Sequence, residues 1–172
     1  MHTSIRKGPD SVAEYSPIPA EQVPEATANG LTLSDYSVVP KWRVFAGHED
    51  VKPGTSRKLD EQLVWSVSPG EWTVTGSRPD RDPAVDLTHV RVMFRLTGAD
   101  ARSLLAKICA LDLGDAMFPQ GAAARTVVAG VATELVRDDQ NEVLSFLILP
   151  SRSFGRYVHE VLLDAGAEFG LA

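Results

Sequence analysis

The sequence predicts an α+β fold, in which a mostly antiparallel sheet carries two helices on one face. Apolar residues alternate along residues 89–97, and apolar residues at helical spacing follow at once. A second apolar strand at residues 143–149 is also followed by a helical pattern. The order in the second half of the chain is therefore strand, helix, one or two strands, strand, helix. This order indicates two helices layered on one side of a largely antiparallel sheet.

The first thirty residues differ in composition from the rest of the 172-residue chain. Four prolines and few large apolar residues occur in residues 1–30, so this segment buries too little surface to offset the entropy of ordering it. We expect a flexible N-terminal arm there, followed by a single α+β domain over residues 31–172. The arm is either an unstructured terminus or a segment that orders against a partner subunit.

The segment from residue 31 to residue 84 predicts strands and loops only. Its expected elements are a short strand at Leu31 and Leu33, a strand at residues 39–46 with Pro40 at its start or on an edge, a loop at residues 47–60, a hairpin of residues 62–67 and 71–75, and a loop at residues 76–84. Ser68, Pro69 and Gly70 supply the turn of the hairpin.

Residues 89–113 predict a strand followed by a helix. Val90, Val92, Phe94 and Leu96 alternate with polar residues, as in a half-buried strand. Thr97 and Asp100 have the spacing of a capping box, and apolar residues then recur on one helical face: Ala101, Leu104, Leu105 and Ile108.

The remaining residues predict further strands and a second helix. Valine-rich residues 124–137 suit one or two strands bent at Gly130, and residues 138–141 suit a polar turn. Residues 143–149 are nearly all apolar, which is typical of a central strand covered on both faces. Ser151 can cap the second helix and Gly166 can end it. The apolar stripe of this helix consists of Phe154, Tyr157, Val158, Val161, Leu162 and Ala165.

Composition excludes several classes of protein. The formal net charge of −6 argues against a nucleic-acid partner, because phosphate binding needs a basic surface. No apolar run approaches the length needed to span a bilayer, and no signal-like apolar segment follows Met1. The single cysteine, Cys109, cannot form an internal disulfide and is expected in the core. A cytoplasmic location, with no membrane partner, is therefore expected.

The sequence assigns no catalytic, cofactor-binding or metal-binding residue. Its four histidines are scattered, and His159 is expected to be solvated. His89 next to Asp86 could act as a general base, but no nucleophile or second base accompanies it. Asp138 and Asp139 are explained by turn chemistry.

Arginine and tryptophan provide the remaining candidates. Arg91 and Arg95 share the non-core face of one predicted strand, where they either grip a carboxylate, cross a subunit interface or simply face solvent. The three tryptophans are expected in the core rather than as ligand platforms. They are Trp42, Trp65 and Trp72.

Three stretches of the chain resemble the gamma subunit of heterotetrameric sarcosine oxidase. The first is the hairpin at residues 64–74, with its Pro-Gly-Glu-Trp turn. The second runs from residue 85 to residue 113 and includes the Leu-Thr-Gly-Ala-Asp-Ala and Lys-Ile-Cys-Ala-Leu-Asp-Leu runs. The third combines residues 118–126 with residues 146–154, where an extra Ser151 precedes the arginine. The resemblance covers about residues 63–165, whereas the arm and residues 31–60 look divergent.

The gamma subunit is itself similar to the first folate-binding domain of the glycine cleavage T-protein (aminomethyltransferase). In that wider family a glycine-rich hairpin carries a Gly-Gly-x-x-Asp-[Asp/Glu] signature whose aspartate helps to bind the folate-linked substrate. The corresponding stretch here, residues 125–134, has no paired glycines and no aspartate. The resemblance therefore transfers no catalytic residue, and it implies a domain that kept the fold and lost the site.

The resemblance implies an assembly with larger alpha and beta subunits. Those subunits would bind FAD, FMN, NAD and tetrahydrofolate and would oxidatively demethylate an N-methyl amine such as sarcosine. This chain would then be a non-catalytic accessory or scaffold subunit with no cofactor of its own. Two alternatives stay open: a stand-alone folate or small-molecule binding domain with a pocket lined by Trp72, Arg91 or Arg125, and an enzyme that uses His89 and Asp86.

Overall fold

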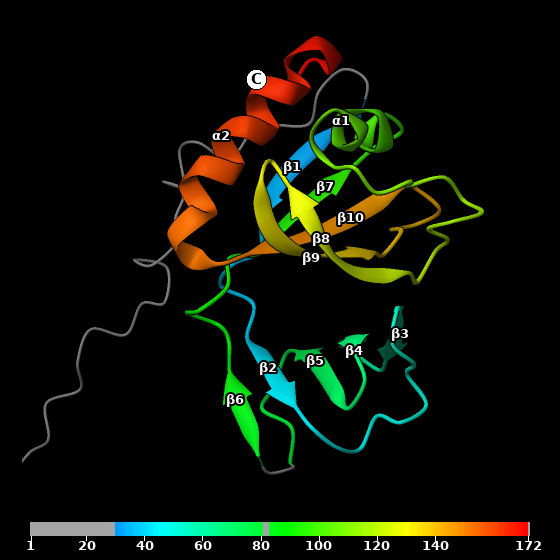
Figure 1. The fold of residues 1–172 in the computed structure, drawn as a ribbon, viewed down its shortest axis with the longest axis vertical. Helices are drawn as coiled ribbons and strands as arrows, with labels where there is room; N and C mark the ends of the chain where they lie inside the picture. Colours follow the sequence, from blue (N-terminus) through cyan, green and yellow to red (C-terminus); the bar gives the residue numbers. More distant parts are fainter. Residues whose placement is uncertain (1–29, 81–82, 172) are drawn as a thin grey trace, which may run out of the picture.

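In the described part of the chain, the protein consists of two five-stranded antiparallel sheets and two α-helices (Figure 1). A computed structural model describes residues 30–80 and 83–171, so the expected arm lies almost entirely outside the described residues. The predicted α+β class, with antiparallel strands and two helices, is confirmed.

The first sheet carries both helices and is called the helix-covered sheet. Its strands in spatial order are β1 (Thr32–Asp35), β7 (Phe94–Thr97), β10 (Ser145–Pro150), β9 (Val131–Arg137) and β8 (Ala123–Val128). The central strand β10 is buried along its whole length, as its continuous apolar run predicts. Helices α1 (Ala101–Ile108) and α2 (Gly155–Gly166) pack on one face of this sheet.

The second sheet lies below the first in Figure 1 and has no helix on it among the described residues. Its strands in spatial order are β3 (Thr55–Leu59), β4 (Gln62–Ser68), β5 (Glu71–Thr75), β2 (Lys41–Val44) and β6 (Ala84–Asp86). The expected hairpin is present, because β4 pairs with β5 around a turn in which Gly70 has a φ of 74°. Strand β3 lies in the expected loop at residues 47–60, and β6 begins where the expected loop at residues 76–84 ends. Both strands are short and mostly exposed, so neither shows an apolar alternation.

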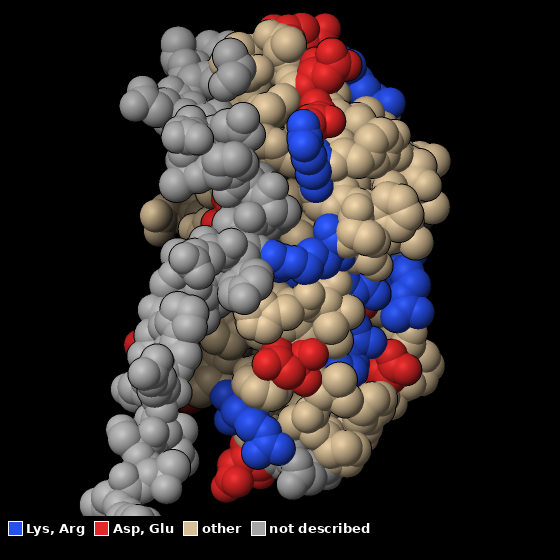
Figure 2. Space-filling view, turned by 90° about the vertical axis from the view of Figure 1, so that its left-hand side faces the viewer, with Lys and Arg blue, Asp and Glu red and all other residues tan. Residues whose placement is uncertain are grey.

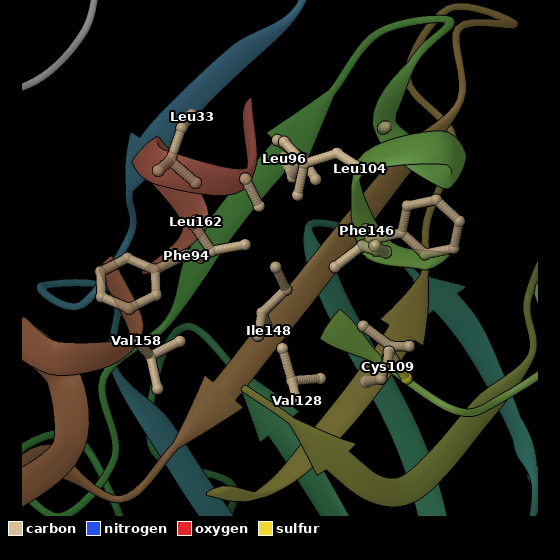
Figure 3. Packing of buried hydrophobic residues seen from close by; sticks show 14 of the residues in the cluster. Leu33, Phe94, Leu96, Leu104, Cys109, Val128, Phe146, Ile148, Val158 and Leu162 are labelled. Carbon is tan, nitrogen blue, oxygen red and sulfur yellow. The ribbon is translucent and has the colours of Figure 1, made fainter. Parts of the chain in front are cut away.

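The main core fills the space between the helices and the helix-covered sheet (Figure 3). Leu104 from α1, Val158 and Leu162 from α2, and Phe94 and Ile148 from the strands are all fully buried there. Cys109 is also buried in this core, as expected. The core therefore depends on the two strand–helix repeats that the apolar spacing predicts.

The hairpin of β8 and β9 corrects the expected bend at Gly130. Val128 pairs with Val131, so Ala129 and Gly130 form a two-residue turn. Both turn residues have positive φ, 53° and 77°, which is the geometry of a type I′ turn. The valine-rich segment is therefore two strands joined by a tight turn.

The expected strand at residues 89–97 is shorter in the structure, because β7 begins only at Phe94. Asp86 accepts a hydrogen bond from the backbone N–H of Thr88, and the N–H groups of Val90 and Arg91 both donate to the carbonyl of Leu87. These local bonds hold the segment before β7 in a turn and leave Val90 exposed.

Two expected helix caps are wrong for identifiable reasons. The Thr97 hydroxyl lies 2.9 Å from the Ser145 hydroxyl across the sheet, and no side-chain bond caps α1 at Asp100. Ser151 likewise makes no capping bond, because a 3-10 turn, η3 (Arg152–Phe154), separates it from α2. In both cases the residue has the right type, but a neighbouring element determines what it contacts.

Candidate functional site

The inner faces of the two sheets meet at an apolar interface, called the inter-sheet interface. The edges of the sheets also join: the N–H of Ser56 donates to the carbonyl of Gly121 at 2.6 Å, and the N–H of Ala123 donates to the carbonyl of Gly54 at 2.9 Å. The side chains of the interface are Leu63, Trp65, Met93, Ala123, Val136, Leu147 and Leu149. Ionisable side chains enter this apolar interface from both sheets, and they are the natural candidates for a site.

Glu134 is the most buried carboxylate at the inter-sheet interface, with 2% of the residue exposed. One carboxylate oxygen accepts a bond from the guanidinium of Arg43 at 2.7 Å, and the other accepts from the indole N–H of Trp65 at 2.9 Å. Arg125 lies 3.8 Å away, and Arg43 also pairs with Glu71 at 2.7 Å. Both oxygens of Glu134 thus accept hydrogen bonds from groups of the chain itself. This carboxylate therefore connects the two sheets and has no free oxygen for a ligand.

Asp138 forms a second buried cluster just beyond β9. Its carboxylate accepts hydrogen bonds from Arg95 at 2.8 Å and from the side-chain amide of Gln140 at 2.7 Å, and it lies 3.2 Å from the ammonium group of Lys58. Arg95 in turn lies over the ring of Tyr36, 5.2 Å from its centre. The expectation that turn chemistry alone explains Asp138 is therefore wrong, because this residue pairs with cations from both sheets.

A hollow of about 340 Å³ opens beside the Asp138 cluster. Leu63, Met93 and Leu147 form its apolar part, and Tyr36, Lys58, Arg95, Asp138 and Gln140 are among its polar lining residues. Its size lies within the range of about 300–1,000 Å³ that is typical of small-molecule pockets. The hollow therefore combines an apolar surface with charged groups, as binding sites do.

A second hollow of about 350 Å³ lies next to β8 and has a more apolar lining, which includes Leu111, Met117 and Phe118. Neither of these two hollows is lined by Trp72, Arg91 or Arg125. The pocket residues expected for a binding domain therefore do not line them.

Lys41 is a fully buried lysine where the chain crosses between the sheets. Its ammonium group donates to the carbonyls of Ser37 at 2.9 Å and Val39 at 2.7 Å, and its backbone N–H donates to the Thr88 hydroxyl. Burial lowers the pKa of Lys41 to about 8, although the negative charges of Asp35 and Asp86 act in the opposite direction. Lys41 therefore connects the segment between β1 and β2, which contains Ser37 and Val39, to the segment between β6 and β7, which contains Thr88. Nothing in the sequence pattern indicates that this lysine is buried.

His159 is buried in the structure, so the expectation that it is solvated is wrong. Only 4% of the residue is exposed, and its ring lies 5.8 Å from that of Phe94. Burial lowers the pKa of His159, and the nearby Asp35 and Glu160 oppose this shift. The buried stripe of α2 also differs from the predicted one. Val158, Leu162 and Ala165 are buried as predicted, whereas Phe154 and Tyr157 are about half exposed and Val161 is only partly buried. His159 and Gly166 are buried in their place.

The remaining candidates are engaged by neighbouring groups or lie at the surface. Arg91 lies outside β7, and its guanidinium donates to the carbonyl of Leu149 at 3.0 Å. His89 is exposed in a turn. Burial raises the pKa of Asp86, but hydrogen bonds from Thr88 and the charges of His89 and Lys41 outweigh burial, so the net pKa is lowered. A carboxylate and an exposed histidine thus lie near each other, and nothing in the described geometry supplies the nucleophile that catalysis would need.

The tryptophans take structural roles. Trp65 and Trp72 are buried, as expected, whereas Trp42 is only partly buried and donates to the carbonyl of Gly76 at 3.0 Å.

Among residues 30–80 and 83–171, no group of three or more His, Cys, Asp or Glu side chains could hold a metal ion. No helix in the described part of the chain is long and apolar enough to cross a membrane.

The fold and the inter-sheet interface define an α+β protein of two antiparallel sheets, whose buried carboxylates are bound by its own arginines, lysine and tryptophan. A chain of the heterotetrameric sarcosine oxidase from Corynebacterium sp. U-96, solved in complex with pyrrole 2-carboxylate, shares this fold. The TM-score is 0.73 at 23% sequence identity, and the match covers 88% of this chain and 91% of that chain. No protein-family model matches the sequence, and no curated protein matches it.

Proposed function

We propose that this chain is a non-catalytic accessory subunit, of the gamma type, in a heterotetrameric sarcosine oxidase-like flavoenzyme. The observation that carries the proposal is the mutual coverage of the structural match, 88% of this chain and 91% of the other. A match that extends over nearly all of both chains supports equivalent subunits better than it supports a shared subdomain.

The buried carboxylates also favour an accessory role. Glu134 lies in the stretch that corresponds to the folate-binding signature of the T-protein family, and its oxygens are occupied by Arg43 and Trp65. Releasing this carboxylate for catalysis would leave a buried guanidinium without one of its two partners, which is costly. The chain thus acts as one α+β domain of T-protein-like descent, while the larger alpha and beta subunits bind FAD, FMN, NAD and tetrahydrofolate in the cytoplasm.

Co-purification of the tagged full-length chain from its native host tests this function. We expect larger subunits to co-elute, a flavin absorbance band near about 450 nm, and oxidation of sarcosine or a related N-methyl amine by the complex. The chain expressed alone should be colourless and inactive. A colourless, lone protein from the native host would contradict the proposal.

A second candidate, a stand-alone small-molecule binding domain, has one observation in its favour, the hollow beside Asp138. Calorimetry of the isolated chain with tetrahydrofolate tests it, with Arg95→Met as the variant that alters the wall of the hollow. Binding heat that disappears in this variant would favour the second candidate over the first. An absence of heat for the wild-type chain would leave the accessory role as the better account.

A further inference from the structure

The hollow beside Asp138 lies between the two sheets, and each sheet contributes a cation and a neighbouring apolar side chain to it. Lys58 on β3 pairs in register with Leu63 on β4, so both side chains lie on the same face of the second sheet. Arg95 on β7 pairs in the same way with Leu147 on β10 of the helix-covered sheet. The two walls of the hollow are therefore built alike, each with a charged group beside an apolar one.

The two cations keep hydrogen-bond donors that the described part of the chain does not use. An arginine has five N–H donors, and Arg95 makes three side-chain hydrogen bonds there, two to Asp138 and one to Ser145. The ammonium group of Lys58 has three donors, and it lies 3.2 Å from the carboxylate of Asp138 on a side chain that is 57% exposed. Among the described residues, both cations thus share this one carboxylate. The cluster therefore keeps one positive charge and free donors for the carboxylate of a ligand.

Two further carboxylates line the hollow at the turn between β3 and β4, those of Asp60 and Glu61. Both residues are exposed, and neither side chain forms an ion pair or a hydrogen bond among residues 30–80 and 83–171. Asp60 follows Lys58 by two residues, so a negative group and a positive group lie close together at one end of β3. The ammonium group of a ligand would find free acceptors there.

The apolar part of the hollow distinguishes it from the rest of the charged surface. On the face that Figure 2 shows, basic and acidic side chains lie interspersed, so charge alone does not single out a binding site there. In the hollow, charges of both signs adjoin Leu63, Met93 and Leu147, which are buried side chains of the inter-sheet interface. A mostly apolar surface with a few polar groups at fixed places is the composition of a small-molecule site.

From this arrangement we infer that the hollow binds an α-amino acid with an apolar side chain. The ligand carboxylate is bound by Lys58 and Arg95, the ligand ammonium group by Asp60 or Glu61, and the ligand side chain packs on the apolar part of the hollow. None of the residues that line the hollow lies in residues 125–134, the stretch that corresponds to the folate-binding signature, so this site is independent of that signature. It is also independent of the proposed function, because every group that forms it belongs to this chain.

Calorimetric titration of the full-length chain with L-leucine tests the site. Three probes each lack one of the groups that the hollow is expected to bind. The compound 4-methylpentanoate lacks the ammonium group, 3-methylbutylamine lacks the carboxylate, and glycine lacks the apolar side chain. We expect L-leucine to bind at least about tenfold more tightly than each of the three probes, because each probe leaves one part of the hollow without its partner.

Two variants assign the two ends of the ligand. Lys58→Met should weaken the binding of L-leucine at least about tenfold and leave the weaker binding of 3-methylbutylamine unchanged. The double variant Asp60→Asn with Glu61→Gln should also weaken L-leucine but leave 4-methylpentanoate unchanged, and asparagine tolerates the positive φ of 53° at position 60. The matched control is Lys52→Met, which removes an exposed ammonium group that donates to the carbonyl of Glu49. It should bind L-leucine as the wild type does, and circular dichroism confirms that each variant is folded.

Three outcomes would overturn the inferred site. An absence of heat with L-leucine, L-methionine and L-phenylalanine removes the ligand class. Equal binding of L-leucine and 4-methylpentanoate replaces the amino acid with a simple carboxylic acid. Binding of L-leucine that is unchanged in both variants places the ligand outside the hollow. None of these results alters the co-purification of larger subunits, so the proposed function stands or fails separately.

Discussion

The carboxylate of Glu134 accepts a hydrogen bond from the indole N–H of Trp65 at 2.9 Å, and this bond joins β9 of the helix-covered sheet to β4 of the second sheet. Both residues are almost completely buried. Arg43 adds a charged bond from β2 to the same carboxylate at 2.7 Å. The two sheets are therefore joined by buried polar contacts as well as by the apolar side chains of the inter-sheet interface.

Replacing Glu134 with leucine should lower the free energy of unfolding by about 3 kcal/mol, because the substitution leaves Trp65 without its acceptor and Arg43 with only Glu71. Glu134→Gln keeps an acceptor oxygen, so it should lower the free energy of unfolding by less than Glu134→Leu does. Urea unfolding followed by tryptophan fluorescence measures both. The control is Glu61→Gln at an exposed position, which should change stability by less than about 0.5 kcal/mol. Equal stabilities for Glu134→Leu and the control would show that the bond contributes nothing.

Lys41 should make stability rise with pH on the alkaline side. Its pKa in the folded protein is about 8, against an ordinary value of 10.5. Between these values the unfolded chain binds a proton that the folded chain does not, so raising the pH favours the folded state. The contribution is on the order of 3 kcal/mol across the window, since one pKa unit corresponds to about 1.36 kcal/mol.

The measurement for Lys41 is the difference in unfolding free energy between wild type and Lys41→Met at several pH values from 7 to 10. This difference should be flat below about pH 8 and then shift in favour of the wild type. Met117→Ala is the control, because the exposed Met117 carries no titrating group, and its difference curve should stay flat over the same pH range. A flat curve for Lys41→Met would mean that the buried lysine titrates normally.

Much of the helix-covered sheet can be predicted from the sequence, because its strands and helices bury one face each and carry the matching apolar period. The apolar face of α1 is an example, and the continuous apolar run of β10 predicts a strand that is covered on both faces. The second sheet is harder, since β3 contains Thr55, Ser56, Arg57 and Lys58 and is held by hydrogen bonds to β4 instead of by buried side chains. A polar edge strand of this kind leaves no periodic signal.

The polar clusters at the inter-sheet interface could not be predicted, because each combines residues far apart in the chain. Glu134 and Arg43 are 91 positions apart, and Arg95 and Asp138 are 43 apart. Glu134 does leave a local trace, as an acidic residue between Thr133 and Leu135 in a valine-rich strand. Such a residue indicates a buried partner of opposite charge, but its identity depends on how the sheets pack.

His159 should make the protein less stable as the pH falls below about 6.5. Burial lowers the pKa of this histidine from 6.5, so in mildly acidic solution the unfolded chain takes up a proton that the folded chain resists. His159→Leu removes the titrating group and should reduce the difference in melting temperature between pH 7.5 and pH 5. Phe154→Leu, at an exposed position and with no titrating group removed, should retain the wild-type difference. The prediction fails if His159→Leu and the wild type lose the same stability on acidification.

Gly98 should be the least replaceable glycine at the start of the helix-covered sheet. Its φ is 138°, and an added Cβ would lie 2.8 Å from both the carbonyl oxygen of Gly30 and the Cα of Leu31. These are backbone atoms at the entry to β1, so the clash cannot be relieved by turning a side chain. Gly98→Ala should therefore lower the unfolding free energy by at least about 3 kcal/mol, which combines the cost of the unfavourable φ with displacement of the strand.

Gly130→Ala separates these two contributions. Gly130 also has a positive φ, 77°, but an added Cβ meets nothing within 4 Å, so this variant carries the conformational cost without the clash. Gly130→Ala should therefore lower the free energy of unfolding by only about 1 kcal/mol. Urea unfolding of the two variants side by side measures the difference. Similar losses in both would show that β1 moves away from Gly98 at little cost, and that the close approach of Leu31 does not hold the edge of the sheet in place.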